Sequence, residues 1–256
     1  NEQTAVNNYF QEDIDLQNVE INKQAQEEFD AYVFKLRSYG VQVVVISDTA
    51  TSDTPDSLFP NNWISFHSEG IVGLYPMFAE NRRLERRDDI LNELEKSGFL
   101  IENIVDYTSA EDQGFYLEGT GSIILDRVNK KAYCALSARA DEDLFIEFCE
   151  DFEYTPVVFV ANQTVDGKRE AIYHTNVMMC VAETFAVICL DTIDDKATRT
   201  NVVKHLKEDG KNIIDITEAQ MNSFAGNMLH VRGENDALLL VISNTAHAYL
   251  TELKLY

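Results

Sequence analysis

The sequence lacks long apolar runs, an excess of basic residues and a recognisable leader, and each absence narrows the class of protein. No apolar run approaches the roughly 20 residues that a membrane-spanning helix needs, and the N-terminus does not resemble a signal peptide. The 21 Lys and Arg residues are outnumbered by 44 Asp and Glu residues, which gives a net charge of −23. Phosphate binding needs clustered cations, so we expect neither a nucleic-acid nor a membrane partner.

Paired cysteine motifs are also absent. The four cysteines are Cys134, Cys149, Cys180 and Cys189. They lie in apolar segments without CxxC spacing, which favours buried thiols in a reducing cytoplasm. No HExxH motif or carboxylate cluster has metal-ligand spacing, so we expect no metal and no organic cofactor. The acidic field favours a cationic small molecule as partner, although solubility alone accounts for many acidic chains.

What is present is a repeated unit of two strands, a helix and a third strand. First strands begin at Trp63, Ser122, Val177 and Met228, a period of roughly 50–60 residues that is typical of propellers and solenoids. Ahead of them the pattern predicts a helix over 23–39 and a strand over 41–47. The first unit itself is predicted as strands over 63–67 and 71–75, a helix over 82–97 and a strand over 104–107. No linker divides the chain, so we expect residues 1–256 to form a single domain.

The repeat does not close at either end. Before Trp63 there is a helix and a strand but no strand pair, and no strand follows the helix that begins near Asn244. The first residue is Asn1 rather than Met. We therefore expect terminal strands to be missing at both ends, as in a piece of a longer protein.

Polar residues interrupt the apolar pattern just before the first strand of each unit. The four segments read PDSLFPNNW (55–63), YLEGTGS (116–122), IYHTNV (172–177) and FAGNM (224–228). A ring of repeats would bring them together on its axis. Taken singly they are weak signals, because a GxG makes many turns and an isolated histidine such as His174 is more often structural. Glu118 is harder to explain, since a carboxylate that enters a buried strand needs a partner.

Together, the motifs PDSLFPNNW, MFAENRRLERRDDIL, LEGTGS, IYHTNVMM and FAGNML resemble the guanidino-group-modifying (pentein) superfamily along the whole chain. The resemblance is closest to arginine-deiminase-related citrulline-utilisation proteins and more distant to dimethylarginine dimethylaminohydrolases. It implies an α/β fold, specifically a five-bladed propeller of ββαβ repeats with pseudo-fivefold symmetry. It also implies a small guanidino or ureido amino acid as the partner.

The resemblance assigns the acid–base roles to two residues. Glu118 of LEGTGS would orient the histidine, and His174 of IYHTNV would act as general base and acid. A cysteine thiolate would add to the resonance-stabilised carbon, after which His174 would protonate the departing amine and then activate water. The family's nucleophile lies near its C-terminus, so we expect this cysteine beyond Tyr256. Cys180 is no substitute, because six residues along one strand separate it from His174 by roughly 20 Å.

The resemblance also implies which residues contact the substrate: Asp56, Phe59, Asn62, Arg82, Arg139 and Asn176. Of these, Arg82 and Arg139 would grip the α-carboxylate. Asp56 would face the guanidinium. Asn62 and Asn176 stand where relatives that bind arginine often have acids. An amide offers one acceptor and a donor, which suits a ureido group such as that of citrulline. The alternative, that the two asparagines merely tune the pocket, stays open.

Several functions are compatible with these residues. The first is a hydrolase acting on a C–N bond of an arginine derivative or citrulline. An amidinotransferase shares the covalent intermediate, and a non-catalytic propeller could hold an amino acid through Arg82, Arg139 and Asp56. A translation-factor-like assembly protein shares only the fold, and the acidic charge with the Glu118–His174 pair argues against it. No motif indicates whether the protein is a homo-oligomer.

Overall fold

The computed structural model describes residues 1–10, 18–48 and 54–250. Three of its sheets repeat one pattern. In each sheet two antiparallel strands are followed by a helix and by a third strand that pairs in parallel with the second. The strands are β1 (Ile64–Phe66), β2 (Ile71–Leu74) and β3 (Asn103–Asp106); β4 (Ile123–Asp126), β5 (Lys131–Ala135) and β6 (Thr155–Phe159); and β9 (Met179–Val181), β10 (Phe185–Ile188) and β11 (Asn212–Asp215). The predicted repeat is therefore confirmed.

The intervening helices are α4 (Asp88–Lys96), α6 (Glu142–Asp151) and α8 (Lys196–Glu208). A fourth unit contains the antiparallel pair β12 (Leu229–Arg232) and β13 (Leu238–Val241), followed by α10 (Asn244–Leu250). Helices outside these units include α2 (Asn18–Ser38), α3 (Glu80–Arg83) and α9 (Glu218–Asn222). The 3₁₀ turns are η1 (Pro60–Asn62), η2 (Ser68–Gly70), η3 (Thr108–Gln113), η4 (Leu190–Thr192) and η5 (Glu234–Asp236). No helix in the described ranges has both the length and the apolar character that crossing a bilayer requires.

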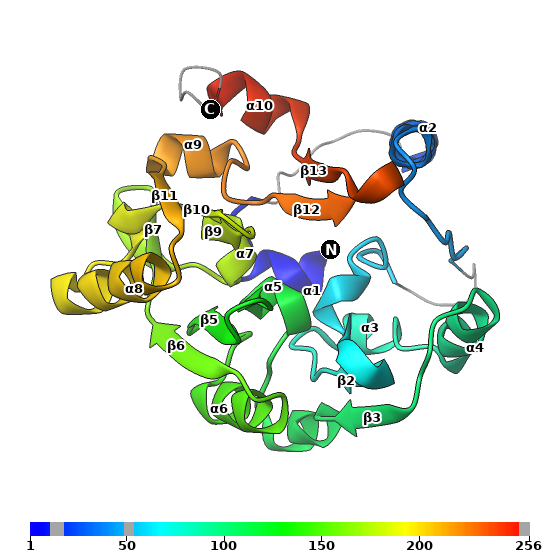
Figure 1. Ribbon diagram of the computed structural model, residues 1–256, viewed down its shortest axis with the longest axis horizontal. Coiled ribbons are helices and arrows are strands. Elements are labelled where there is room, and N and C mark those ends of the chain that lie inside the picture. Colours follow the sequence, from blue (N-terminus) through cyan, green and yellow to red (C-terminus); the bar gives the residue numbers. More distant parts are fainter. Residues whose placement is uncertain (11–17, 49–53, 251–256) are drawn as a thin grey trace.

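The sheets are arranged around a centre, and their helices lie on the outside (Figure 1). Three short helices occupy that centre: α1 (Glu2–Ala5), α5 (Gly119–Ser122) and α7 (Thr175–Met178). The middle strand of each sheet is buried, with Val72, Tyr133 and Val187 all at 0% exposure. The predicted α/β fold is confirmed. Five-bladed symmetry stays a prediction, because the described residues form three complete units of this kind and the strand pair of a fourth.

Two predicted elements are wrong in detail. Residues 41–48 form no strand, and arginine side chains bind two of their carbonyl groups: Arg37 Nη2 donates to Val43 O at 2.8 Å, and Arg87 Nη1 to Ser47 O at 3.1 Å. The helix predicted over 82–97 is split into α3 and α4, because Arg87 adopts an extended conformation with φ −126° and ψ 126°.

Two further features were not predicted. A hairpin of β7 (Asn162–Val165) and β8 (Lys168–Ala171) turns at Asp166 and Gly167, which have φ values of 50° and 77°. The Asp-Gly pair is a known hairpin signal. The third unit's first strand begins at Met179 rather than at Val177, since residues 175–178 form α7.

Candidate active site

The four polar segments that precede the first strands meet at the centre, as predicted. Glycines allow the approach: a Cβ atom on Gly121 would lie 2.3 Å from Asn62 Nδ2 and 2.9 Å from the His174 ring. A Cβ atom on Gly226 would lie 2.4 Å from the carbonyl oxygen of Val177. A larger residue at either position would push the segments apart.

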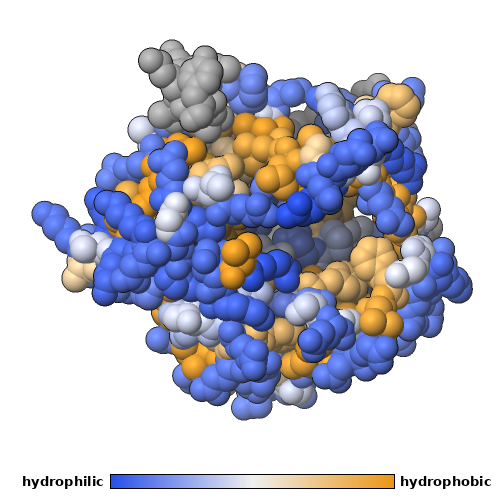
Figure 2. Space-filling view, viewed as in Figure 1, coloured by the Kyte–Doolittle hydropathy of each residue, from blue (hydrophilic) through white to orange (hydrophobic). Residues whose placement is uncertain are grey.

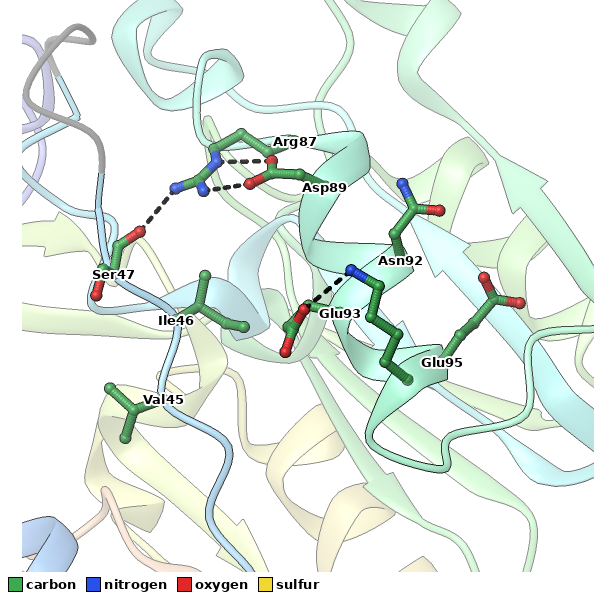
Figure 3. Close-up of a pocket in the computed structure, with 9 residues that line it drawn as sticks. Val45, Ile46, Ser47, Arg87, Asp89, Asn92, Glu93 and Glu95 are labelled. Atoms are coloured by element: carbon green, nitrogen blue, oxygen red, sulfur yellow. Dashed lines mark hydrogen bonds and ion pairs between the residues drawn. The ribbon is translucent and has the colours of Figure 1, made fainter.

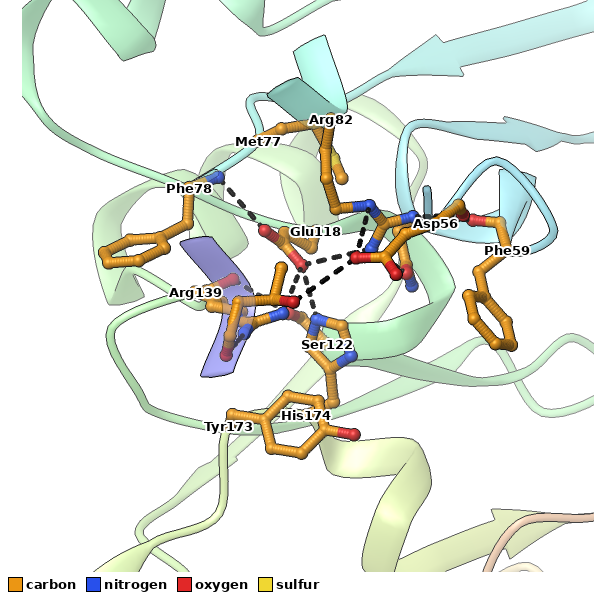
Figure 4. A network of polar contacts seen from close by, with 12 residues as sticks. Asp56, Phe59, Met77, Phe78, Arg82, Glu118, Ser122, Arg139, Tyr173 and His174 are labelled. Carbon is orange, nitrogen blue, oxygen red and sulfur yellow. Dashed lines mark hydrogen bonds and ion pairs between the residues drawn. The ribbon is translucent and has the colours of Figure 1, made fainter. Parts of the chain in front are cut away.

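Glu118 and His174 form a buried pair between two units (Figure 4). Glu118 immediately precedes α5 and His174 is the residue before α7. His174 Nε2 lies 2.6 Å from Glu118 Oε2, and the other carboxylate oxygen accepts from Phe78 N at 3.0 Å. Glu118 is 0% exposed and His174 is 4% exposed. A carboxylate at Nε2 favours a proton on that nitrogen, which leaves Nδ1 as the basic atom.

The electrostatics of the pair favour a carboxylate and a neutral imidazole at neutral pH. Burial alone would raise the pKa of Glu118, but the hydrogen bond from His174 and the charges of Arg139 and Arg82 outweigh it and lower the pKa to about 2. Burial lowers the pKa of His174, and this effect exceeds the opposing attraction of Glu118. A neutral imidazole beside a fixed carboxylate can accept a proton and return it.

Arg82, on α3, is 2% exposed and is surrounded by acceptors. Its Nε donates to Glu85 Oε1 at 2.9 Å, and its Nη1 to Asn62 Oδ1 at 2.6 Å. Its Nη2 donates to Glu85 Oε2 and to the carbonyl oxygens of Asp56 and Phe59. Arg82 thus fixes the loop before β1. Glu85, just beyond the end of α3, was not predicted from the sequence, although its i,i+3 spacing from Arg82 was a usable signal.

Arg139 is 1% exposed and lies on the other side of Glu118. Its Nη1 is 3.6 Å from Glu118 Oε2, and its guanidinium carbon lies 4.8 Å from the centre of the Tyr173 ring. Its Nε donates to Asn7 Oδ1 at 2.9 Å, while its Nη2 donates to Thr4 O at 2.9 Å and also to Asn7 Oδ1.

The N-terminal segment, residues 1–10, is therefore part of the centre, which was not predicted from the sequence. Asn1 Nδ2 donates to Asp56 Oδ2 at 2.7 Å, and Thr4 Oγ1 donates to the same oxygen at 3.3 Å. The ring of Phe10 packs against Phe224 at 5.7 Å between centroids. These residues are distant in sequence from all their partners, so no local motif indicated the contacts.

Phe59 and Asn176 line a groove of about 620 Å³ bordered by β4, β9 and β12, and neither Glu118 nor His174 is among its lining residues. The side chain of Phe59 is 55% exposed, and the backbone carbonyl of Asn176 accepts from Asn227 Nδ2 at 3.2 Å. Apolar residues gather over the part of the molecule where β12 and β13 lie (Figure 2), with Leu229 at 56% exposure.

A second hollow, of about 770 Å³, lies between residues 45–47 and α4 (Figure 3). None of the predicted site residues lines it. Four of its charged side chains form two pairs, since Arg87 Nη2 lies 2.5 Å from Asp89 and Lys96 Nζ lies 3.4 Å from Glu93.

None of the four cysteines lies in an environment that favours a thiolate. All are buried, and burial raises the pKa of Cys149 and Cys189 to about 12 and that of Cys180 to about 11. Burial also raises the pKa of Cys134. Within the ranges that the structure describes, no group of three or more potential ligands could hold a metal ion.

Solved structures of arginine-modifying enzymes share this fold. The N-terminal domain of ArgZ, an arginine dihydrolase from Cyanobacteria, bound to substrate, has a TM-score of 0.63 at 16% identity, over 90% of this chain and 77% of that one. A dimethylarginine dimethylaminohydrolase adduct with S-methyl-L-thiocitrulline has a TM-score of 0.59 at 16% identity, over 90% and 79%. Unliganded AgrE gives 0.64 at 16% identity, over 91% of this chain but only 31% of AgrE.

The family itself is identified by sequence. The family model of eukaryotic N,N dimethylarginine dimethylhydrolases matches residues 1–255, and the chain belongs to this family. No curated protein sequence matches the chain.

Proposed function

We propose that this protein hydrolyses a C–N bond of a guanidino or ureido amino acid through a covalent thiol intermediate. His174 serves as general base and acid, and Glu118 orients it. The observation that carries this proposal is the buried 2.6 Å contact between His174 Nε2 and Glu118 Oε2 at the centre of the repeats. Membership of a family of guanidino-group hydrolases supports it at the general level.

The proposed reaction needs His174 and one cysteine thiol, and its atoms and protons balance. Neutral His174 first takes the proton of the cysteine thiol. The thiolate forms a C–S bond to the central carbon of the substrate group, and the C–N bond to the leaving amine breaks as that amine takes the proton from the His174 imidazolium. Neutral His174 then removes a proton from water, whose oxygen forms the new C–O bond. The C–S bond breaks, its electron pair returns to sulfur, and the sulfur takes the proton back from His174. The buried, weakly acidic thiols of the four described cysteines do not suit this role.

The orientation of Asn62 favours a ureido substrate. Arg82 has only donors, so the amide oxygen of Asn62 faces it, and Nδ2 is the atom close to Gly121 and His174. An N–H donor matches a ureido carbonyl oxygen, whereas a guanidinium offers only donors. This supports citrulline over arginine as the substrate. The roles of Asp56 and Asn176 in substrate binding stay predictions.

Turnover by the full-length protein tests the reaction. We expect release of amine from L-citrulline, arginine or methylated arginine, and its loss after thiol alkylation. Glu118→Gln keeps the size of the side chain but removes the charge that orients His174, and we expect turnover to fall on the order of 10³-fold. Glu111→Gln is the matched control, since Glu111 pairs with Arg86 at 2.5 Å and has no contact with His174. Turnover of Glu118→Gln within twofold of wild type would contradict the proposal.

Competition tests the substrate preference. L-citrulline should displace a bound ligand at a lower concentration than L-arginine. Asn62→Asp replaces the donor with an acceptor and should shift the preference toward arginine by about tenfold. Displacement by arginine far below the citrulline concentration in the wild type would rule out the ureido preference.

A further inference from the structure

Glu85 is a buried carboxylate to which the proposed mechanism gives no role. It is 3% exposed and lies just beyond the end of α3, where its backbone N–H donates to Arg82 O at 3.1 Å. Its side chain accepts from Arg82 Nε at 2.9 Å and from Arg82 Nη2 at 3.0 Å. Two other carboxylates near this guanidinium are farther away, since Asp56 Oδ2 lies 3.9 Å from Nε and Glu118 Oε2 lies 4.0 Å from Nη1 (Figure 4). Glu85 is therefore well placed to determine how Arg82 is oriented.

The two hydrogen bonds from Arg82 to Glu85 fix the plane of the guanidinium. Nε and Nη2 form one edge of this planar group, and a carboxylate that accepts from both holds the edge in one orientation. Nη1 then points the other way and donates to Asn62 Oδ1 at 2.6 Å. Nη1 carries two N–H groups and Asn62 takes one of them, so this geometry is compatible with the predicted contact between Arg82 and a substrate carboxylate.

The orientation of Arg82 in turn decides which atom of the Asn62 amide faces the site. An arginine only donates, so Oδ1 faces Arg82 and Nδ2 lies on the side of Gly121. A Cβ atom on Gly121 would lie 2.3 Å from Nδ2 and 2.9 Å from the His174 ring, so the amide nitrogen and the imidazole approach the same point. A rotated amide would present an acceptor there instead of a donor.

We propose that Glu85 is a positioning residue that sets the preference between ureido and guanidino substrates. Its carboxylate fixes Arg82, and Arg82 fixes the Asn62 amide with Nδ2 toward the substrate. Supporting contacts of this kind hold a binding group in its productive orientation. This inference rests on the proposed function, because the orientation of the amide selects a substrate only if the substrate group binds beside Asn62.

The first test is the ratio of the affinities for L-citrulline and L-arginine, measured by calorimetry on the full-length protein. Glu85→Gln keeps the size of the side chain but replaces one acceptor oxygen with a donor, so Arg82 loses one of its two bonds and the Asn62 amide can rotate. We expect the preference for citrulline to fall about fivefold. Glu80→Gln is the matched control, because Glu80 is exposed and lies on the same short helix as Arg82. An unchanged ratio in a folded Glu85→Gln protein overturns the inference.

A second pair of variants separates this route from a general loosening of the site. If Glu85 acts through the amide, it has nothing left to orient in an Asn62→Ala protein. In that background Glu85→Gln should change the citrulline-to-arginine ratio by less than about twofold. A change of full size there would show that Glu85 acts independently of Asn62 and would contradict the inference. If Glu85→Gln does not fold, Glu85→Asp provides the same comparison, since a side chain shorter by one methylene cannot reach both nitrogens as closely.

A third measurement needs no substrate. The side-chain NH₂ signals of Asn62 in NMR spectra, identified by their loss in Asn62→Asp, report the surroundings of Nδ2. We expect these signals to shift in Glu85→Gln and to stay in place in Glu80→Gln. Unchanged signals in a folded Glu85→Gln protein would rule the inference out. If the wild type binds neither citrulline nor arginine, the proposed function fails, and the Asn62 signals still decide whether Glu85 fixes the amide.

Discussion

At the scale of single residues, the closest approach in the site is at Gly121. Its Cα faces both Asn62 and His174, and a methyl group there would lie 2.3 Å from the Asn62 amide nitrogen. Real Cβ contacts are never so short, so one of the two side chains must move. The proposed function depends on a fixed distance between them, because displacements near 1 Å are costly in catalysis.

We therefore predict that Gly121→Ala lowers turnover by about 10²-fold, with citrulline turnover as the measurement. Gly210→Ala provides the contrast. Gly210 has a φ of 71°, but no atom lies within 4 Å of the position that its methyl group would take, so alanine there should cost about 1 kcal/mol of stability and leave turnover unchanged. Equal turnover losses in the two variants would argue against a specific clash at the site.

The site could be predicted from the sequence only in part. The motifs located Glu118 and His174 just before first strands, and the structure brings the two side chains into contact. Their catalytic roles stay predictions. Asn7 and Glu85 escaped notice because their importance comes from tertiary contacts with arginines rather than from a motif of their own.

At the scale of elements, a buried ion pair joins two neighbouring sheets. Lys211, just before β11, lies 2.8 Å from Asp126 at the end of β4, with the two side chains 0% and 2% exposed. The same ammonium donates to the carbonyl oxygens of Ala182 and Glu183 between β9 and β10. All three of its N–H donors are therefore paired.

Removing one partner of such a pair leaves an uncompensated charge in the interior. We predict that Lys211→Met lowers the free energy of unfolding by about 3–5 kcal/mol, measured by urea denaturation. The control is Lys204→Met, which removes an exposed i,i+4 pair with Glu208 and should cost about 0.5 kcal/mol or less. Similar losses of unfolding free energy in both variants would show that the buried Lys211–Asp126 pair contributes little to stability.

The elements also show where sequence patterns are insufficient. The apolar run VQVVVIS predicts a strand over 41–47, but a strand needs a neighbouring strand, and arginine side chains bind two of its carbonyl groups instead. The pattern over 82–97 correctly predicts helical structure in this region, where α3 and α4 lie. It did not reveal the break at Arg87, whose guanidinium binds Ser47 O and Asp89 across the turn.

At the scale of the whole molecule, stability should fall on mild acidification. His67 packs 4.0 Å from the ring of Phe152 and bonds to Ser65 Oγ at 2.7 Å. Burial, with the charges of Arg127 and Lys130, lowers its pKa to about 4. Burial lowers the pKa of His174 too. The unfolded chain therefore binds more protons below the ordinary value of 6.5, so the folded state loses stability as the pH falls from there toward 4.

Urea denaturation at pH 7.5, 6.5 and 5.5 measures this trend. Most carboxylates stay ionised over that range, so the net charge of −23 changes little and the histidines dominate. His67→Gln should flatten the decline, while replacement of the exposed His247 by glutamine should not. A stability that rises on going from pH 7.5 to 5.5 would be inconsistent with this prediction.

The division of the acid–base pair between two repeats has a consequence for the newly made chain. Glu118 belongs to the second unit and His174 to the third, and the elements from α5 to β8 lie between them in the sequence. Neither unit holds both members, so a ribosome-bound chain acquires the pair only after the third unit has docked on the second. Until that moment the buried contact between the two side chains does not exist, so the proposed acid–base pair is created by the assembly of the repeats.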